Sequence, residues 1–228
     1  MDEKAAACVE SGRGTLMSPD LSALYPLGYL SSLAFGLRFA VQWLYSEAKG
    51  QSVVISPFWW LSLAGNTLLL THALIQMQFH VAFVQAINAV ISWRNLNLMR
   101  PESEQKSLTF TLALMGGAAL LVFALFLALF SEWFRIPDPT VDISWGWHLI
   151  GFAGLFLFSS RFILQWWDAE KKRQSYLGPT FWWMSIAGGT LSILYFAQTH
   201  DPVNLIGPSL GMIPYVRNLM LTTKRAAT

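Results

Sequence analysis

The chain contains an internal repeat with a constant spacing. Residues 38–43 read Arg-Phe-Ala-Val-Gln-Trp, and residues 161–166 read Arg-Phe-Ile-Leu-Gln-Trp, 123 positions later. The segments at 58–65 and 94–96 recur at the same offset, so the two copies align without a gap. Chance does not keep a register over so many residues. The chain is therefore an internal duplication, which restricts its fold to two similar units.

The composition is that of a membrane protein. Hydrophobic residues make up 54% of the chain and charged residues only 12%, whereas soluble domains carry about 25% charged residues. The net charge of +2 comes without a dense basic stripe, which argues against a nucleic-acid partner. We therefore predict a multi-pass membrane protein that does not bind nucleic acid.

Stretches of about 20 mostly apolar residues predict membrane-spanning helices. Each copy of the repeat contains three such stretches, and one further stretch between the copies has no duplicate. Because a three-helix unit crosses the membrane an odd number of times, the extra helix allows the two copies to run parallel. The seven predicted helices span residues 21–45, 56–77, 79–98, 107–131, 144–167, 179–199 and 202–222.

The Lys and Arg residues of the short loops predict how these helices are oriented, because such residues favour the cytoplasmic side. The side with few of them holds Lys4, Arg13 and Arg135, so we predict an external N-terminus and a cytoplasmic C-terminus. The opposite side receives Lys49, Arg100, Lys106, Lys171, Lys172, Arg173, Lys224 and Arg225. The predicted parts are a disordered leader without a signal peptide (1–20), a first three-helix bundle (21–98), a connector with a linker helix (99–143), a second bundle (144–222) and a cytoplasmic tail (223–228).

Three motifs carry a resemblance to a known family. Arg-Phe-x-x-Gln-Trp and Phe-Trp-Trp-x-Ser occur in both copies, and Tyr-x-Arg-Asn-Leu occurs at 215–219. Together they resemble the lipid A biosynthesis N-terminal domain family of the PQ-loop/SWEET-like superfamily, in two copies. The resemblance implies an all-α membrane fold of seven transmembrane helices in a 3+1+3 SWEET-like parallel repeat. It also implies a location in the bacterial inner membrane, with the N-terminus periplasmic, and a role with envelope glycolipids.

The family domain is sometimes fused to lipid A disaccharide synthase. The soluble glycosyltransferase domain of that enzyme has no room in a chain of 228 residues that lies mostly in the membrane. We therefore expect no enzymatic activity. We also predict no catalytic residue, metal site or cofactor, because the sequence shows no nucleophile–base pair, phosphate-binding loop or carboxylate pair.

Four arginines and four amides are expected to meet at one depth of the membrane. Arginine and glutamine four residues apart share one helix face in each copy, and an Arg-Asn pair ends the third helix of each copy. Arginine inside a span is costly and can bind phosphate through two parallel hydrogen bonds. We predict that these residues bind the anionic head group of a lipid. They are Arg38, Gln42, Arg94, Asn95, Arg161, Gln165, Arg217 and Asn218.

The arginines also have structural interpretations. Those at helix ends can reach lipid phosphates at the membrane surface or cap helix C-termini. Arg38 and Arg161, which lie deeper, can form an ion pair within the chain with Glu47 or Glu170.

Aromatic and polar residues extend the predicted binding site. A tryptophan pair opens the second helix of each copy, where it can belong to an aromatic belt at the membrane surface or stack on a sugar. Two asparagines of the first copy lie where a pathway through the protein would run. We therefore add Trp59, Trp182, Asn66 and Asn88 to the predicted substrate-binding residues.

These observations favour a transporter or flippase for a lipid-linked sugar or envelope glycolipid, which would work by rocking one bundle against the other. Two alternatives stay open: a non-transporting membrane partner that docks a glycosyltransferase, and an enzyme that modifies lipid A. The predicted partners are a membrane lipid or polyprenyl-phosphate-linked sugar and, as a further candidate, a glycosyltransferase. We expect a monomer, because one chain already contains both repeats.

Overall fold

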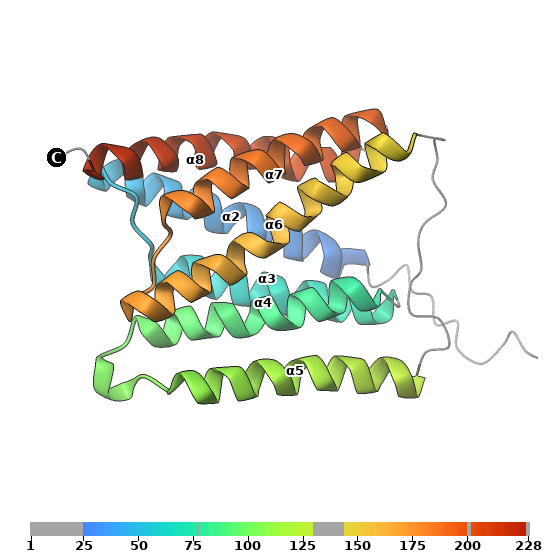
Figure 1. Ribbon diagram of the computed structural model, residues 1–228, viewed down its shortest axis with the longest axis horizontal. Coiled ribbons are helices and arrows are strands. Elements are labelled where there is room, and N and C mark those ends of the chain that lie inside the picture. Colours follow the sequence, from blue (N-terminus) through green and yellow to red (C-terminus); the bar gives the residue numbers. More distant parts are fainter. Residues whose placement is uncertain (1–24, 77, 130–143, 200–201, 227–228) are drawn as a thin grey trace, which may run out of the picture.

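The computed structural model describes residues 25–76, 78–129, 144–199 and 202–226. In this part the chain forms seven α-helices, one short 3-10 helix and no β-strand (Figure 1). The predicted helices are confirmed as helices, with ends that differ from the predicted ones by at most five residues. The predicted disorder of the leader concerns residues outside the described part. The helices are α2 (Tyr25–Lys49), α3 (Ser56–Ile75), α4 (Phe79–Leu98), η2 (Glu102–Glu104), α5 (Leu108–Leu129), α6 (Trp145–Lys172), α7 (Pro179–Gln198) and α8 (Pro202–Ala226).

Three of these helices, α3, α5 and α6, are long and apolar enough to cross a membrane by their length and composition. Polar side chains that are buried inside the molecule, such as Arg38 on α2 and Asn218 on α8, make several of the other helices less apolar. Seven transmembrane helices therefore stay a prediction.

The helices pack as two groups of three, with one helix on the outside. Within the first group α3 contacts both α2 and α4, and within the second group α7 contacts both α6 and α8. Contacts of α2 with α8 and of α4 with α6 connect the two groups. Helix α5 packs along α4 at the edge of the molecule (Figure 1). The helix without a duplicate thus lies outside the two groups and not between them.

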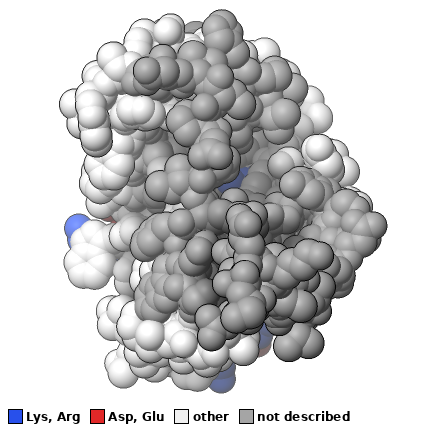
Figure 2. Space-filling model, turned by 90° about the vertical axis from the view of Figure 1, so that its right-hand side faces the viewer, with Lys and Arg blue, Asp and Glu red and all other residues white. Residues whose placement is uncertain are grey.

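The connections after α2, α4 and α6 all lie at one end of the molecule, together with the C-terminal end of α8 (Figure 1). We call this the loop end, and it carries the basic residues Lys49, Arg100, Lys106 and Lys171. Figure 2 looks onto the opposite end. Most described atoms there belong to uncharged residues, and blue atoms of Lys or Arg show near the middle and at the left and lower edges of the view. Lys49, Arg100, Lys106 and Lys171 are therefore gathered at a single end of the described part.

Helices α2 and α6 both end at a left-handed residue, but the residue type differs between the two copies. Gly50, which follows α2, has a φ of 63°, and Arg173, which caps α6 at the equivalent position, has a φ of 52°. A left-handed residue at this point ends a helix and satisfies its last carbonyl groups. Glycine adopts this conformation without the steric penalty that a side chain brings. The second copy therefore has a strained residue where the first has a relaxed one.

Replacing Arg173 by glycine is expected to stabilise the protein. The substitution removes the left-handed penalty and should raise the free energy of unfolding by about 1 kcal/mol. Thermal unfolding of the purified protein in detergent, followed by circular dichroism, measures this change. Lys172→Gly, inside the helix, is the matched control and should lower stability by about 1 kcal/mol. If Arg173→Gly also lowers stability, contacts of the arginine side chain outweigh the backbone strain.

Candidate functional site

Arg38 and Arg161 lie at equivalent positions in the two groups of helices, and both are almost fully buried, with 6% and 2% of their surface exposed. Nη1 of Arg38 donates a hydrogen bond to Oγ of Ser62 at 3.1 Å. Nη1 of Arg161 donates in the same way to Oγ of Ser185 at 2.9 Å. The serines are themselves 123 residues apart, so the duplication preserves both the arginine and the group that fixes its rotamer. We call Arg38 and Arg161 the arginine pair.

Aromatic rings surround the arginine pair. The guanidinium carbon of Arg38 lies 4.5 Å from the ring centre of Phe35, and that of Arg161 lies 3.8 Å from the ring centre of Phe158. The ring of Phe162 contacts both cations, at 4.9 Å from Arg38 and 5.0 Å from Arg161. Both positive charges therefore contact one shared ring, between the two groups of helices.

Two glycines make room for the outer rings. A Cβ atom at Gly65 would lie 2.5 Å from the ring of Phe35, and one at Gly188 would lie 2.9 Å from the ring of Phe158. Small residues at these positions predict close helix packing. In the structure they also provide the space in which a phenylalanine lies against each arginine.

The arginine pair has no acidic partner among the ion pairs of the described residues. The predicted alternative of an ion pair with Glu47 or Glu170 is wrong, because these glutamates bind Arg217 and Arg94 instead. Nine residues separate Arg161 from Glu170, which places them about 13.5 Å apart along one helix. Arginine in hydrocarbon costs about 2.5–3.5 kcal/mol. Each cation–π contact returns about 0.5–2 kcal/mol, so several rings together can offset this cost.

The four predicted amides form two pairs that join the two groups of helices. Nε2 of Gln42 donates to Oδ1 of Asn218 at 2.8 Å, and Nδ2 of Asn218 donates back to Oε1 of Gln42 at 3.0 Å. Gln165 and Asn95 exchange the same two hydrogen bonds at 2.8 and 3.1 Å. All four side chains are buried. The amides thus bind each other across the interface, one helical turn from the arginine pair towards the loop end.

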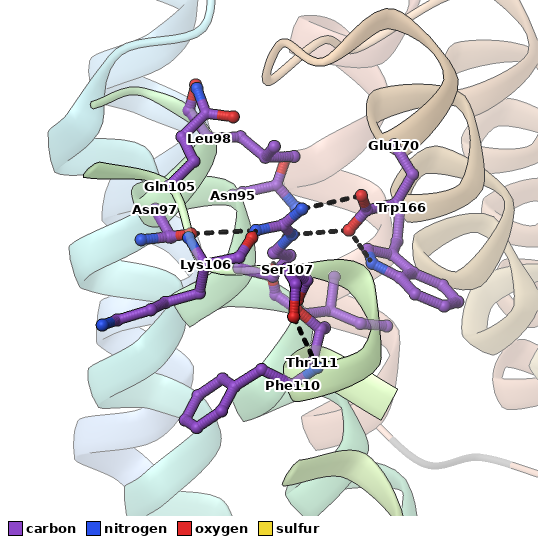
Figure 3. A network of polar contacts seen from close by, with 12 residues as sticks. Asn95, Asn97, Leu98, Gln105, Lys106, Ser107, Phe110, Thr111, Trp166 and Glu170 are labelled. Carbon is purple, nitrogen blue, oxygen red and sulfur yellow. Dashed lines mark hydrogen bonds and ion pairs between the residues drawn. The ribbon is translucent and has the colours of Figure 1, made fainter. Parts of the chain in front are cut away.

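The remaining two arginines form ion pairs across the same interface. Nε and Nη2 of Arg94 donate to the two carboxylate oxygens of Glu170 at 2.5 and 2.8 Å. Nη1 of Arg94 also donates to Oδ1 of Asn97 and to the carbonyl of Lys106, and Trp166 donates to Glu170 (Figure 3). The Glu170 carboxylate therefore occupies the edge of Arg94 that could otherwise bind a lipid phosphate or cap a helix.

The equivalent ion pair in the other half joins Arg217 to both carboxylate oxygens of Glu47. Its side chains are 38% and 33% exposed, whereas those of Arg94 and Glu170 are 0% and 7% exposed. The two pairs therefore have the same chemistry in different environments. We call the two amide pairs and the two ion pairs the cross-repeat network.

The predicted tryptophans divide between the interior and the surface. Trp59 and Trp182 are fully buried, whereas the neighbouring Trp60 and Trp183 are about 60% exposed. Nε1 of Trp59 donates to Oγ of Ser175 at 2.7 Å. Nε1 of Trp182 is buried and has no hydrogen-bond partner in the described part of the chain. The exposed members suit a belt at a membrane surface, and the buried members belong to the aromatic core.

The predicted asparagines Asn66 and Asn88 lie apart from the cross-repeat network. Nδ2 of Asn66 donates to Oγ of Ser92 at 3.1 Å, and Ser92 donates to the carbonyl of Asn88 at 2.8 Å. Sequence reasoning missed Ser62 and Ser185, which hold the arginine pair. Their signal was available, because the serine occurs at the same position in both copies.

Comparison with known proteins identifies the family. The family described as Lipid A Biosynthesis N-terminal domain matches residues 27–97 and 150–220, again 123 positions apart. No solved structure matches the chain. Membership of the PQ-loop/SWEET-like superfamily therefore stays a prediction.

Several curated relatives share the name Lipid-A-disaccharide synthase. The relative from Chlamydia caviae is 39% identical over 215 residues, which cover 89% of this chain and 34% of the relative. The relative from Chlamydia pneumoniae is 38% identical over 207 residues, covering 88% and 34%. That from Chlamydia trachomatis serovar D is 36% identical over 213 residues, covering 89% and 35%. The chain thus spans about a third of the length of the curated relatives it matches.

These relatives correct two predictions. The expected transporter or flippase is wrong, and so is the expected absence of an enzymatic role, because the relatives that match nearly all of this chain bear the name of an enzyme of lipid A biosynthesis. The sequence argument took the absence of a soluble catalytic domain as evidence against an enzyme. The matched segments make up more than half of the chain, which belongs to the Lipid A Biosynthesis N-terminal domain family and carries two copies of the domain.

Proposed function

We propose that the protein takes part in the synthesis of the lipid A disaccharide, as the helical part of the enzyme that binds the acylated sugar. The observation that carries this proposal is the similarity to lipid-A-disaccharide synthases over 88–89% of the chain. Similarity over so much of the chain includes both copies of the repeat. The matched region is about a third of each relative, so we assign to it the binding of the lipid and not the whole reaction.

The distribution of apolar and polar side chains supports a role in lipid binding. An acylated sugar needs an apolar surface for its acyl chains and polar groups for its head. Polar and charged side chains are buried between the two groups of helices, which is how membrane proteins arrange functional groups. Large apolar side chains are exposed along α2, α5 and α6, among them Tyr29, Leu120, Leu129, Leu149 and Phe152.

We place the seven helices across the bacterial inner membrane, as a 3+1+3 parallel repeat of the PQ-loop/SWEET-like type. The loop end would be cytoplasmic and the N-terminus periplasmic. The basic residues of the loop end support this orientation, since Lys and Arg favour cytoplasmic loops. The predicted partners, a membrane lipid or polyprenyl-phosphate-linked sugar and a glycosyltransferase, stay predictions, as does the monomeric state.

Depletion of the protein in its host tests this function. We expect the lipid A disaccharide to fall and its monosaccharide precursors to accumulate, because sugar transfer loses its lipid-binding part. Mass spectrometry of extracted lipids measures the ratio of the two. A plasmid with the wild-type chain should restore the ratio, and so should Lys171→Gln, which changes an exposed side chain of the loop end. An unchanged ratio in depleted cells would exclude a role in disaccharide synthesis.

A further inference from the structure

We propose that Arg38 and Arg161 together bind one phosphate group, carried by an acylated sugar, between the two groups of helices. The acylated sugar rests on the proposed function above. The phosphate rests on the geometry of the arginine pair alone.

Each arginine has one guanidinium nitrogen, Nε, that is available for a further hydrogen bond. The serines hold Nη1 of Arg38 and Nη1 of Arg161. Nε of each arginine is buried and has no hydrogen-bond partner among the described residues. Nε and Nη2 form the side of a guanidinium that binds two oxygens of a phosphate in parallel. The serines therefore fix the rotamers while Nε of each arginine is left for a further acceptor. Arg161 also contacts the side chain of Tyr215, which has no counterpart at the equivalent position of the first copy, Ser92.

The charges of the arginine pair also favour an anion. Both cations contact the ring of Phe162, at 4.9 and 5.0 Å, so they are close enough to repel each other in a medium of low dielectric constant. Neither takes part in the ion pairs of the described residues, which use the other two buried or half-buried arginines. Aromatic rings attract each cation but do not neutralise it. A phosphate between the two arginines would offset both charges at once.

Access to the arginine pair runs past Phe35 and Phe158. Both rings are half-buried and lie directly against a guanidinium group. Arg38 keeps 6% of its surface exposed. The cross-repeat network lies on the side of the arginine pair that faces the loop end. We therefore expect the phosphate to enter from the opposite end, with the two rings turning aside.

Binding measurements on the purified full-length chain in a maltoside detergent test this proposal. The probes are an acylated hexose phosphate, the same lipid without its phosphate, and inorganic phosphate. We expect the wild type to bind the phosphorylated lipid at least about tenfold more tightly than the other two probes. Arg38→Gln and Arg161→Gln should each weaken binding of the phosphorylated lipid by about 10- to 100-fold, because a charge-assisted hydrogen-bond donor is lost. Arg100→Gln, which removes an exposed loop arginine, is the control and should bind as the wild type does.

Two further measurements keep the test decisive. If a glutamine variant does not fold, Arg38→Lys and Arg161→Lys keep the charge but lose the bidentate edge, and they should still weaken binding. The melting temperature without lipid should not fall in the glutamine variants, because they remove a buried, unneutralised cation. A fall without any loss of binding would show that the arginines are structural and would overturn the proposal.

Two outcomes of the binding measurements would contradict the proposal. Equal affinity for both lipids overturns the phosphate site. Inorganic phosphate that binds as tightly as the phosphorylated lipid overturns the acylated sugar as ligand. The binding test and the depletion test can fail independently. A normal disaccharide ratio in depleted cells would exclude the proposed function, but it would not change whether the purified chain binds the phosphorylated lipid.

Discussion

Glu170→Gln is expected to lower the free energy of unfolding by about 3–5 kcal/mol, because it leaves a buried charge without its partner. Arg94 has no exposed surface, and two of its nitrogens bind the Glu170 carboxylate at 2.5 and 2.8 Å. The amide of glutamine still accepts one hydrogen bond but cannot neutralise the guanidinium. The substitution also removes the charge that accepts the hydrogen bond from Trp166.

The duplication supplies the control for this substitution. Glu47→Gln makes the same chemical change in the equivalent ion pair, whose side chains are 38% and 33% exposed. Water can solvate the remaining charge of Arg217 there, so the expected loss is much smaller than for Glu170→Gln. Thermal or denaturant unfolding of both variants in one detergent compares them directly. Equal losses would contradict the view that burial, and not pairing as such, sets the cost.

Much of the fold followed from the constant offset of the two copies. Stretches of apolar residues predicted the helices, and the offset predicted the equivalent loops and the convergence of four amides. Gln42 and Gln165 indeed reach the partner amides Asn218 and Asn95. Amides at equivalent positions of the two copies were therefore predicted correctly as residues that meet between the copies.

The partners within this network could not be predicted in the same way. An offset of 123 fixes the register inside each copy, but it says nothing about how one copy is docked on the other. One alternative had Glu170 bind an arginine of its own helix, but Glu170 binds Arg94 at the end of α4. The contact of α4 with α6 brings them together. Pairing across an interface thus needs the docking geometry, which only the structure supplies.

The function was less accessible than the fold. Buried arginines and amides between two helical groups suit a transport site and a lipid-binding site of an enzyme equally well, because both must hold a polar head in an apolar surrounding. The relatives decided against a transporter. The chain matches only about a third of each relative, so the sequence of the other two thirds could not inform the prediction of function.

Asn95→Leu and Gln165→Leu are each expected to lower the free energy of unfolding by about 1–3 kcal/mol, because each leaves buried polar atoms without a partner. Without Asn95, Oε1 of Gln165 loses its donor, and Oγ of Ser175 loses its acceptor. Without Gln165, the carbonyl of Tyr176 loses the hydrogen bond from Nε2, which measures 3.0 Å.

The double variant Asn95→Leu/Gln165→Leu should lose less stability than the sum of the two single variants, by about 0.5–3 kcal/mol, because residues in direct contact are coupled. Removing both amides leaves two apolar side chains facing each other, which a buried interface tolerates better than one unpaired amide. Unfolding of all four proteins in the same detergent completes the cycle, and the equivalent cycle at Gln42 and Asn218 should give a coupling of the same sign. Strictly additive losses at both sites would mean that the amides do not hold the two groups of helices together. The interface would then depend on the aromatic core and the ion pairs alone.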